Sequence, residues 1–207
     1  MIYVSFILLL FASILGQRFQ WLPFHISLGV LAISILGLAG YSASQIKQTP
    51  MAAIGLIPLA ISLYFAVRGA MVPSVADVAT RWEPEIEYPL STPENSLQTR
   101  ADIIEAAGTA YSHVKPLTVK GDPEAHIISQ ARDLGWRFIG KGENRLQYQV
   151  STALMGYIDD VVVLWEPNGD GYDVHVRSKS RVGKSDLGAN ARRIESFLTQ
   201  LSLRINT

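Results

Sequence analysis

The chain has 207 residues, no cysteine and a formal net charge of zero. Without cysteine it can form neither a disulfide nor a thiolate site. Residues 1–73 contain no acid and three bases, whereas residues 74–207 hold all 18 acids and 15 of the 18 bases, a net charge of −3. We therefore expect an N-terminal part suited to lipid and a C-terminal part suited to water, whose negative charge argues against nucleic acid as a partner.

Three apolar stretches occupy residues 1–73. As a helix, Met1–Gly16 would reach only about 24 Å, short of a ~30 Å hydrocarbon core, and it lacks the basic start of a signal peptide, so it is expected to span or anchor. Leu22–Ala43 is a fuller span, with glycines that allow close helix packing, and Met51–Val67 is a third, interrupted by Pro58. The sequence predicts a three-helix transmembrane anchor over residues 1–73, with membrane lipid as its partner.

The orientation of this anchor is open from charge alone. Arg18 lies in the first loop, Lys47 in the second, and Arg68 at the end of the third span. Because the positive-inside rule counts such flanking bases, the two orientations are nearly balanced.

Residues 74–96 form a predicted proline-rich connector. Pro84, Pro89 and Pro93 each disfavour helix. We expect the segment to lie extended over the following domain, with Trp82 as its docking point.

A soluble α+β domain is predicted over residues 97–207. Leu97–Tyr111 has helical periodicity, and Val114–Val119 suits an edge strand because Pro116 interrupts it. Asp122-Pro123-Glu124 begins a helix that Gly135 ends, with Ile127, Ile128, Ala131 and Leu134 expected on its buried face. The remaining expected elements are strands at 136–139, 145–152, 158–165 and 172–178, and a helix from Leu187. This order predicts an antiparallel sheet with helices packed on one face.

The junction between the last strand and the last helix is strongly basic. Arg177, Lys179 and Arg181 are two residues apart and would project from one face of a strand, and Lys184 and Ser185 precede the helix. Free backbone N–H groups at a helix start, beside several cations, can bind phosphate or carboxylate. The pattern favours an anionic ligand such as a lipid headgroup or a glycan acid.

A structural interpretation of the same junction competes with this one. The cations could pair with Asp159, Asp160 and Asp186, and with Asn190 hold the junction rigid. Because adjacent residues of a strand point to opposite faces, Asp159 and Asp160 are not expected to serve one site.

The sequence lacks the motifs of nucleotide hydrolysis, of a catalytic triad and of a metal site. Gly183-Lys184-Ser185 resembles the end of a phosphate-binding loop, but Ser178 stands where that loop needs glycine. His113, His126 and His175 show no catalytic triad spacing, and nothing has metal-ligand spacing. We expect no metal and no cofactor.

The segment from Arg177 to Ile194 resembles the signature of a bacterial family, domain of unknown function 1499. Its members end in Arg-Ser-x-Ser-Arg-x-Gly-x-Ser-Asp-Leu-Gly-x-Asn-x-Arg-Arg, and the resemblance extends from about Ala76 to the C-terminus. Further matching residues are Lys115-Pro116-Leu117, Gly135-Trp136 and Asp159-Asp160-Val161. The resemblance implies a shared site without an activity. It also implies a cell-envelope protein in the bacterial inner membrane, with the domain on the periplasmic side.

The leading hypothesis is a non-enzymatic envelope protein whose domain binds an anionic ligand or a protein partner at the basic junction. The alternatives are a hydrolase or transferase acting on lipid or glycan and a purely structural assembly factor. In the enzyme, Asp160 would be the base, and Arg177 and Arg181 would hold the anion.

Overall fold

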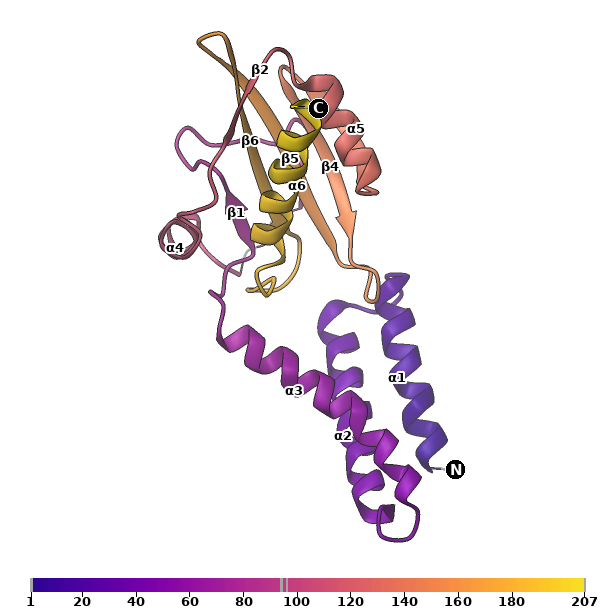
Figure 1. Cartoon of the computed structure of the whole chain (residues 1–207). Helices are drawn as coiled ribbons and strands as arrows, with labels where there is room; N and C mark the ends of the chain where they lie inside the picture. The colour runs from indigo at the N-terminus through magenta and orange to yellow at the C-terminus, as the bar shows by residue number, and fades with distance from the viewer. Residues whose placement is uncertain (1, 94, 96, 207) are drawn as a thin grey trace. The chain divides into compact units, whose positions relative to one another are not determined.

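A computed structural model describes residues 2–93, 95 and 97–206 (Figure 1). The chain divides into two compact units, residues 1–71 with 152–157, and residues 72–151 with 158–207. The first unit contains the helices α1 (Ile2–Arg18), α2 (Phe24–Gln45), η1 (Pro50–Leu56, a 3₁₀ helix) and α3 (Ile57–Ala70). The second contains β1 (Asp77–Ala79), α4 (Arg100–Ala110), β2 (Leu117–Lys120), α5 (Glu124–Asp133), β3 (Arg137–Gly142), β4 (Arg145–Ser151), β5 (Ile158–Asn168), β6 (Gly171–Ser180) and α6 (Ala189–Ile205).

Two helical segments of the first unit are long and apolar enough to cross a membrane. They are Phe24–Gln45 and Pro50–Ala70, with mean hydropathies of 1.9 and 2.0, and α1 is a shorter apolar helix. The third stretch changes from the 3₁₀ helix η1 to the α-helix α3 immediately before Pro58. Pro58 lies in the first turn of α3, where the missing N–H of proline would have no helical partner anyway.

Serine side chains and a glycine join α1 to α2. Ser13 donates its hydroxyl to the Ser27 carbonyl at 2.6 Å, and Ser27 donates to the Ser13 carbonyl at 2.9 Å. A Cβ at Gly37 would lie only 2.2 Å from the Phe6 ring, so the ring packs directly on the backbone of α2. The expected close packing at a glycine is confirmed at this position.

The second unit is built on an antiparallel sheet, as the sequence predicts, and its strand order is β1-β6-β5-β4-β3. β2 also pairs with β6, beside a different part of that strand, and it begins directly after Pro116 at the sheet edge. β1 was not predicted. Asp77–Ala79 pairs with the end of β6 although the sequence placed these residues in the connector.

The sheet is covered on both faces. Against one face, α5 and α6 bury a large core that includes Val161 and Val163 of β5 and Phe197 of α6. On the other face, Val162 and Leu164 are covered by residues of β1 and of the extended segment after it, with Trp82, Ile86 and Tyr88 in the cluster. The expected docking of Trp82 is confirmed.

Several helix ends and faces differ from the predictions. α4 begins at Arg100 because Thr99 caps it: the Thr99 hydroxyl accepts from the Asp102 N–H, and Asp102 accepts from the Thr99 N–H. On α5, Ile128 and Leu134 are exposed, so its buried face is narrower than expected. Gly135 has the predicted left-handed conformation, with a φ of 70°.

Phe197 is the central side chain of the larger core, fully buried and stacked on Trp136 with ring centroids 4.8 Å apart. Phe197→Ala should lower the free energy of unfolding by about 3–5 kcal/mol because it leaves a large cavity. Urea denaturation of the detergent-solubilised chain, followed by near-ultraviolet circular dichroism, measures this change. Leu203→Ala, on the exposed side of the same helix, is the control and should cost much less. Equal losses in the two variants would contradict this description of the core.

Candidate functional site

The junction between β6 and α6 begins with an unusual turn. Leu187 and Gly188 have φ angles of 56° and 76°, so the helix starts at Ala189 and not at Leu187 as predicted. The Asp186 carboxylate accepts from the backbone N–H groups of Gly188, at 2.8 Å, and of Asn190. Burial raises the pKa of Asp186 above its usual range, and these two N–H groups oppose that rise. Two donors that could have bound an external anion are therefore occupied by this side chain.

Residues on the α6 side of the sheet form a buried polar network. Ser178 donates to the Asn190 amide oxygen at 2.6 Å, and the Asn190 amide nitrogen donates to the Ala76 carbonyl at 3.0 Å. Arg193 donates to the Ser178 hydroxyl at 2.7 Å and forms an ion pair with Asp159. The network ties β1, β5, β6 and α6 together.

On the opposite face of the sheet, Arg177 is the centre of a second network. Its guanidinium donates to both carboxylate oxygens of Asp77, at 3.0 and 2.7 Å, and to the Ile86 carbonyl at 3.1 Å. It also pairs with Glu85 and lies 5.5 Å from the centre of the Tyr88 ring. Burial alone would lower the pKa of Arg177, but the hydrogen bonds and charge of Asp77 outweigh it and raise that pKa.

Arg181 has one dominant partner, Asp160. Its Nε and Nη2 atoms donate to the two carboxylate oxygens at 2.7 and 2.8 Å, and Gln149 donates to one of them at 3.3 Å. The hydrogen bond to Asp160 raises the pKa of Arg181, and burial opposes it. Asp160 is fully buried, with both oxygens held by a cation, so its geometry does not suit a general base.

The two neighbouring aspartates of β5 lie on opposite faces of the sheet, as strand alternation predicts. Asp160 pairs with Arg181 on the face of Arg177, and Asp159 pairs with Arg193 on the face of α6. Of the pairs suggested by the sequence, the structure brings Asp160 and Arg181 together. Arg177 instead pairs with Asp77 and Glu85, residues of the predicted connector.

Lys179, Lys184 and Ser185 have different surroundings. Lys179 is half-buried, with its ammonium 3.5 Å from the Thr92 hydroxyl, and no carboxylate of the described residues forms an ion pair with it. Lys184 is exposed, and the Ser185 hydroxyl accepts from the Leu187 N–H at 3.2 Å. The structure therefore does not gather all five predicted binding residues at one point.

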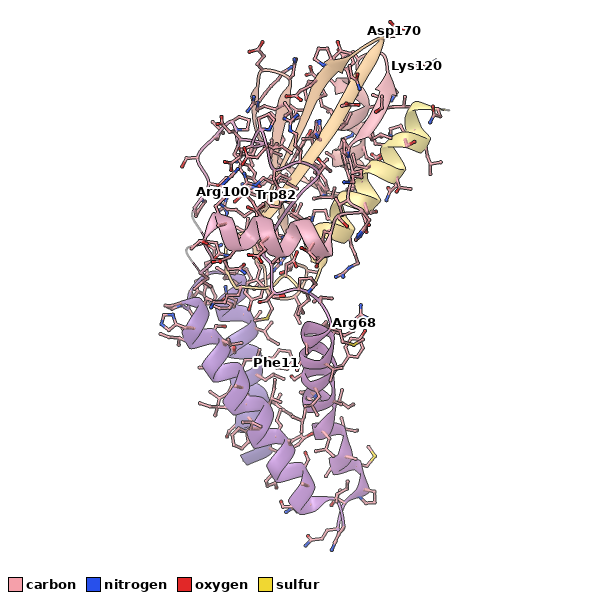
Figure 2. The ribbon with its side chains drawn as sticks, turned by 90° about the vertical axis from the view of Figure 1, so that its left-hand side faces the viewer. Phe11, Arg68, Trp82, Arg100, Lys120 and Asp170 are labelled. Carbon is pink, nitrogen blue, oxygen red and sulfur yellow. The ribbon has the colours of Figure 1, made fainter. Side chains whose placement is uncertain are left out.

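A cavity of about 330 Å³ opens beside two of them, Arg177 and Lys179. Its other described lining residues are Ala76, Asp77, Trp82, Glu85, Asn95, Gln98, Arg100 and Ile103. Arg100, at the start of α4, donates to the Trp82 carbonyl at 3.2 Å, and Figure 2 shows these two residues side by side. Arg100 also pairs with Glu85 inside the cavity and with exposed Glu83 outside it.

The cavity combines charge with apolar surface. Its described lining includes three cations and two carboxylates, and the cation without a carboxylate partner among them is Lys179. Trp82 and Ile103 supply apolar area, and Asn95 and Gln98 supply amides. Such a mixture suits a small ligand with one negative charge and an apolar part.

Sequence reasoning missed most of this lining. The alternation of Glu83, Glu85 and Glu87 with apolar residues was a signal that one side of the connector carries charge. Nothing in the pattern showed that Glu85 would meet both Arg177 and Arg100, because those pairs join distant parts of the chain.

Histidine and metal chemistry are not assembled in the described residues. They contain no group of three or more His, Asp or Glu side chains that could hold a metal. His175 is buried with its Nδ1 atom 3.4 Å from the Thr80 hydroxyl, and burial lowers its pKa.

Asp160→Asn should destabilise the domain by about 3 kcal/mol, because Arg181 would keep a partly buried charge without its carboxylate. Chemical denaturation monitored by near-ultraviolet circular dichroism measures the loss. Asp170→Asn, in the exposed β5–β6 turn, makes the same chemical change and should shift stability by less than about 0.5 kcal/mol. If the two variants were equally stable, the Asp160–Arg181 pair would have no structural role.

The family model described as protein of unknown function (DUF1499) matches residues 74–201, more than half of the chain. No curated protein matches the sequence. The matched region includes β1, the segment that covers the second face of the sheet, and the whole β6–α6 junction. It agrees with the resemblance carried by the segment from Arg177 to Ile194. The chain therefore belongs to the family described as protein of unknown function (DUF1499).

Proposed function

We propose that this is a multi-pass protein of the bacterial inner (cytoplasmic) membrane whose α+β domain binds a small anionic ligand of the cell envelope. The ligand would occupy the cavity beside Lys179. The observation that carries the proposal is the half-buried ammonium of Lys179, which lines the cavity and, among the residues that the structure describes, has the Thr92 hydroxyl as its partner and no carboxylate. A partly desolvated cation without a carboxylate is unfavourable, and an incoming anion would remove that cost.

The shape of the lining suggests what else the ligand contains. Arg177 and Arg100 are already paired with carboxylates, so their positive charges are largely compensated. Trp82 and Ile103 offer apolar contact on the same cavity. We infer a monoanionic group directed at Lys179, attached to a ring or an aliphatic portion that packs on these side chains.

The membrane part of the proposal is a three-helix anchor. α2 and the segment formed by η1 and α3 have the length and hydropathy of membrane spans. The reciprocal Ser13–Ser27 bonds attach α1 to α2, which supports α1 as the third helix of one anchor. With the N-terminus in the cytoplasm, Lys47 would also face the cytoplasm and the domain would lie in the periplasm.

A purely structural role is the second candidate, favoured by the two internal networks of the junction. Arg181 and Arg193 have carboxylate partners, and Asn190 uses its side chain within the domain. If Lys179 binds nothing, the junction serves to hold the domain together.

A melting experiment separates these two roles. The full chain in zwitterionic nanodiscs is heated with a short-chain phosphatidylglycerol, a monoanion with hydrocarbon, or with a sugar acid, a monoanion without it. A ligand present at 100 times its Kd should stabilise the folded state by about 2.7 kcal/mol. Lys179→Gln should weaken binding by roughly 10- to 100-fold, the effect of losing a charge-assisted bond.

Lys184→Gln is the matched control, since it removes one nearby charge outside the cavity lining. It should leave the melting shift unchanged. A shift that persists in Lys179→Gln, or no shift with any of the anions, would favour the structural role.

Topology can be tested because the chain has no native cysteine. Asp170→Cys, in an exposed turn of the domain, should react with a membrane-impermeant maleimide once the outer membrane is permeabilised. Lys47→Cys, in the loop between α2 and η1, should react only after cell lysis. The reverse pattern would place the domain in the cytoplasm.

A further inference from the structure

The loop between β4 and β5, residues 152–157, is apolar and carries no charge. Between Arg145 and Asp159 the sequence contains no charged residue at all. Leu154, in the middle of the loop, is 65% exposed. An exposed, uncharged hairpin tip is unusual on a domain whose other two hairpin turns carry Glu143 and Asp170.

The loop also satisfies much of its own backbone. The Thr152 N–H donates to the Tyr157 carbonyl at 2.9 Å, and the Tyr157 N–H donates to the Thr152 hydroxyl at 2.9 Å. The Gly156 N–H donates to the Thr152 carbonyl at 3.0 Å. Moving a closed loop of this kind out of water costs less free energy, since its backbone polar groups keep their hydrogen-bond partners.

Strand register places the loop at one particular end of the sheet. Asp77 of β1 lies opposite Lys179, Lys179 lies opposite Asp160, and Asp160 lies opposite Gln149. Two residues of β4 separate Gln149 from the β4–β5 loop, so the loop lies at the end of the sheet where β1 begins (Figure 1). The chain from α3 enters the domain at that same end.

The connection from α3 to the domain is very short. α3 ends at Ala70, while Val75 and Ala76 are already buried in the domain and Ser74 accepts a bond from Gln98. The free connection is therefore about three residues, or roughly 10 Å. If α3 crosses the bilayer, the domain begins within about that distance along the chain from the end of the span.

We propose that residues 152–157, which belong to the same compact unit as the helices, insert into the lipid interface as a membrane contact in addition to the spanning helices. This rests on the proposed membrane anchor. Exposed Lys184, in the β6–α6 loop at the same end of the sheet, would meet anionic headgroups beside the inserted loop. Leu154 and Met155 would bury apolar area among the lipid chains, and Tyr157 would lie at headgroup depth.

The test uses single cysteines in the full chain, reconstituted in vesicles of phosphatidylcholine and phosphatidylglycerol. Leu154→Cys carries an environment-sensitive fluorophore, and lipids with a shallow spin label quench it if it is inserted. Asp170→Cys is the matched control, because it lies at the other end of β5, roughly 35 Å away. Figure 2 shows Asp170 beside Lys120 at that end. Leu36→Cys, exposed in the middle of α2, reports on the anchor and is measured with a spin label placed deep in the acyl chains.

We expect the shallow lipid quencher to act roughly threefold or more strongly on Leu154→Cys than on Asp170→Cys, with iodide showing the opposite order. Ala153→Cys, also exposed, should behave like Leu154→Cys. It is the control for a label at position 154 that disturbs the fold. Equal, weak lipid quenching at Leu154 and Asp170, with strong quenching at Leu36, would overturn the loop contact and leave the anchor intact. Protection of Leu154 from both quenchers would indicate a protein partner and also overturn it. Absence of quenching at Leu36 would remove the anchor and this inference together.

Discussion

One buried cation, Arg177, holds the second face of the sheet in place. Its guanidinium binds Asp77 in β1, Glu85 and the Ile86 carbonyl, and it lies over Tyr88. A charge removed from water is tolerated only while its partners stay in position, because each unpaired member would cost several kcal/mol. The interaction therefore fastens a segment near residue 80 to a strand almost a hundred residues later. That segment in turn covers Val162 and Leu164, which would otherwise face water.

Strand alternation explains how one short basic motif serves both faces of the sheet. Arg177, Lys179 and Arg181 point toward the segment after β1, whereas Ser178 and Ser180 point toward α6, where Asn190 joins them. Asp159 and Asp160 divide in the same way. The junction thus connects the sheet to the layers that cover its two faces. The charges of its cations are mostly compensated by carboxylates of the domain itself. Lys179 departs from this arrangement because the carboxylates opposite it in the register, Asp77 and Asp160, are bound by arginines.

Local patterns predicted the elements of the domain better than its site. The end of the α5 helix at Gly135 and the opposite directions of Asp159 and Asp160 in β5 depend on neighbours in sequence, and these predictions agree with the structure. β1 was not predicted because three residues are too few to show a periodic pattern. α6 begins later than predicted because Leu187 adopts a left-handed conformation, which a leucine side chain does not indicate. The cavity lining could not be predicted since Glu85, Arg100 and Arg177 meet only through tertiary folding.

The two ends of the sheet differ in a way that links the cavity to the membrane. One end carries the turn with Asp170 near Lys120, both exposed and charged (Figure 2). The other carries the apolar loop 152–157, and the row that contains Asp77 and Lys179 is close to it in the register. The anion site and the lipid contact that we propose are therefore at the same end of the sheet in the strand register. An anionic lipid would supply the charge for Lys179 and the hydrocarbon for Trp82 and Ile103, whereas a sugar acid would supply the charge alone. Apolar contact in the cavity is thus the physical property that distinguishes these two classes of ligand.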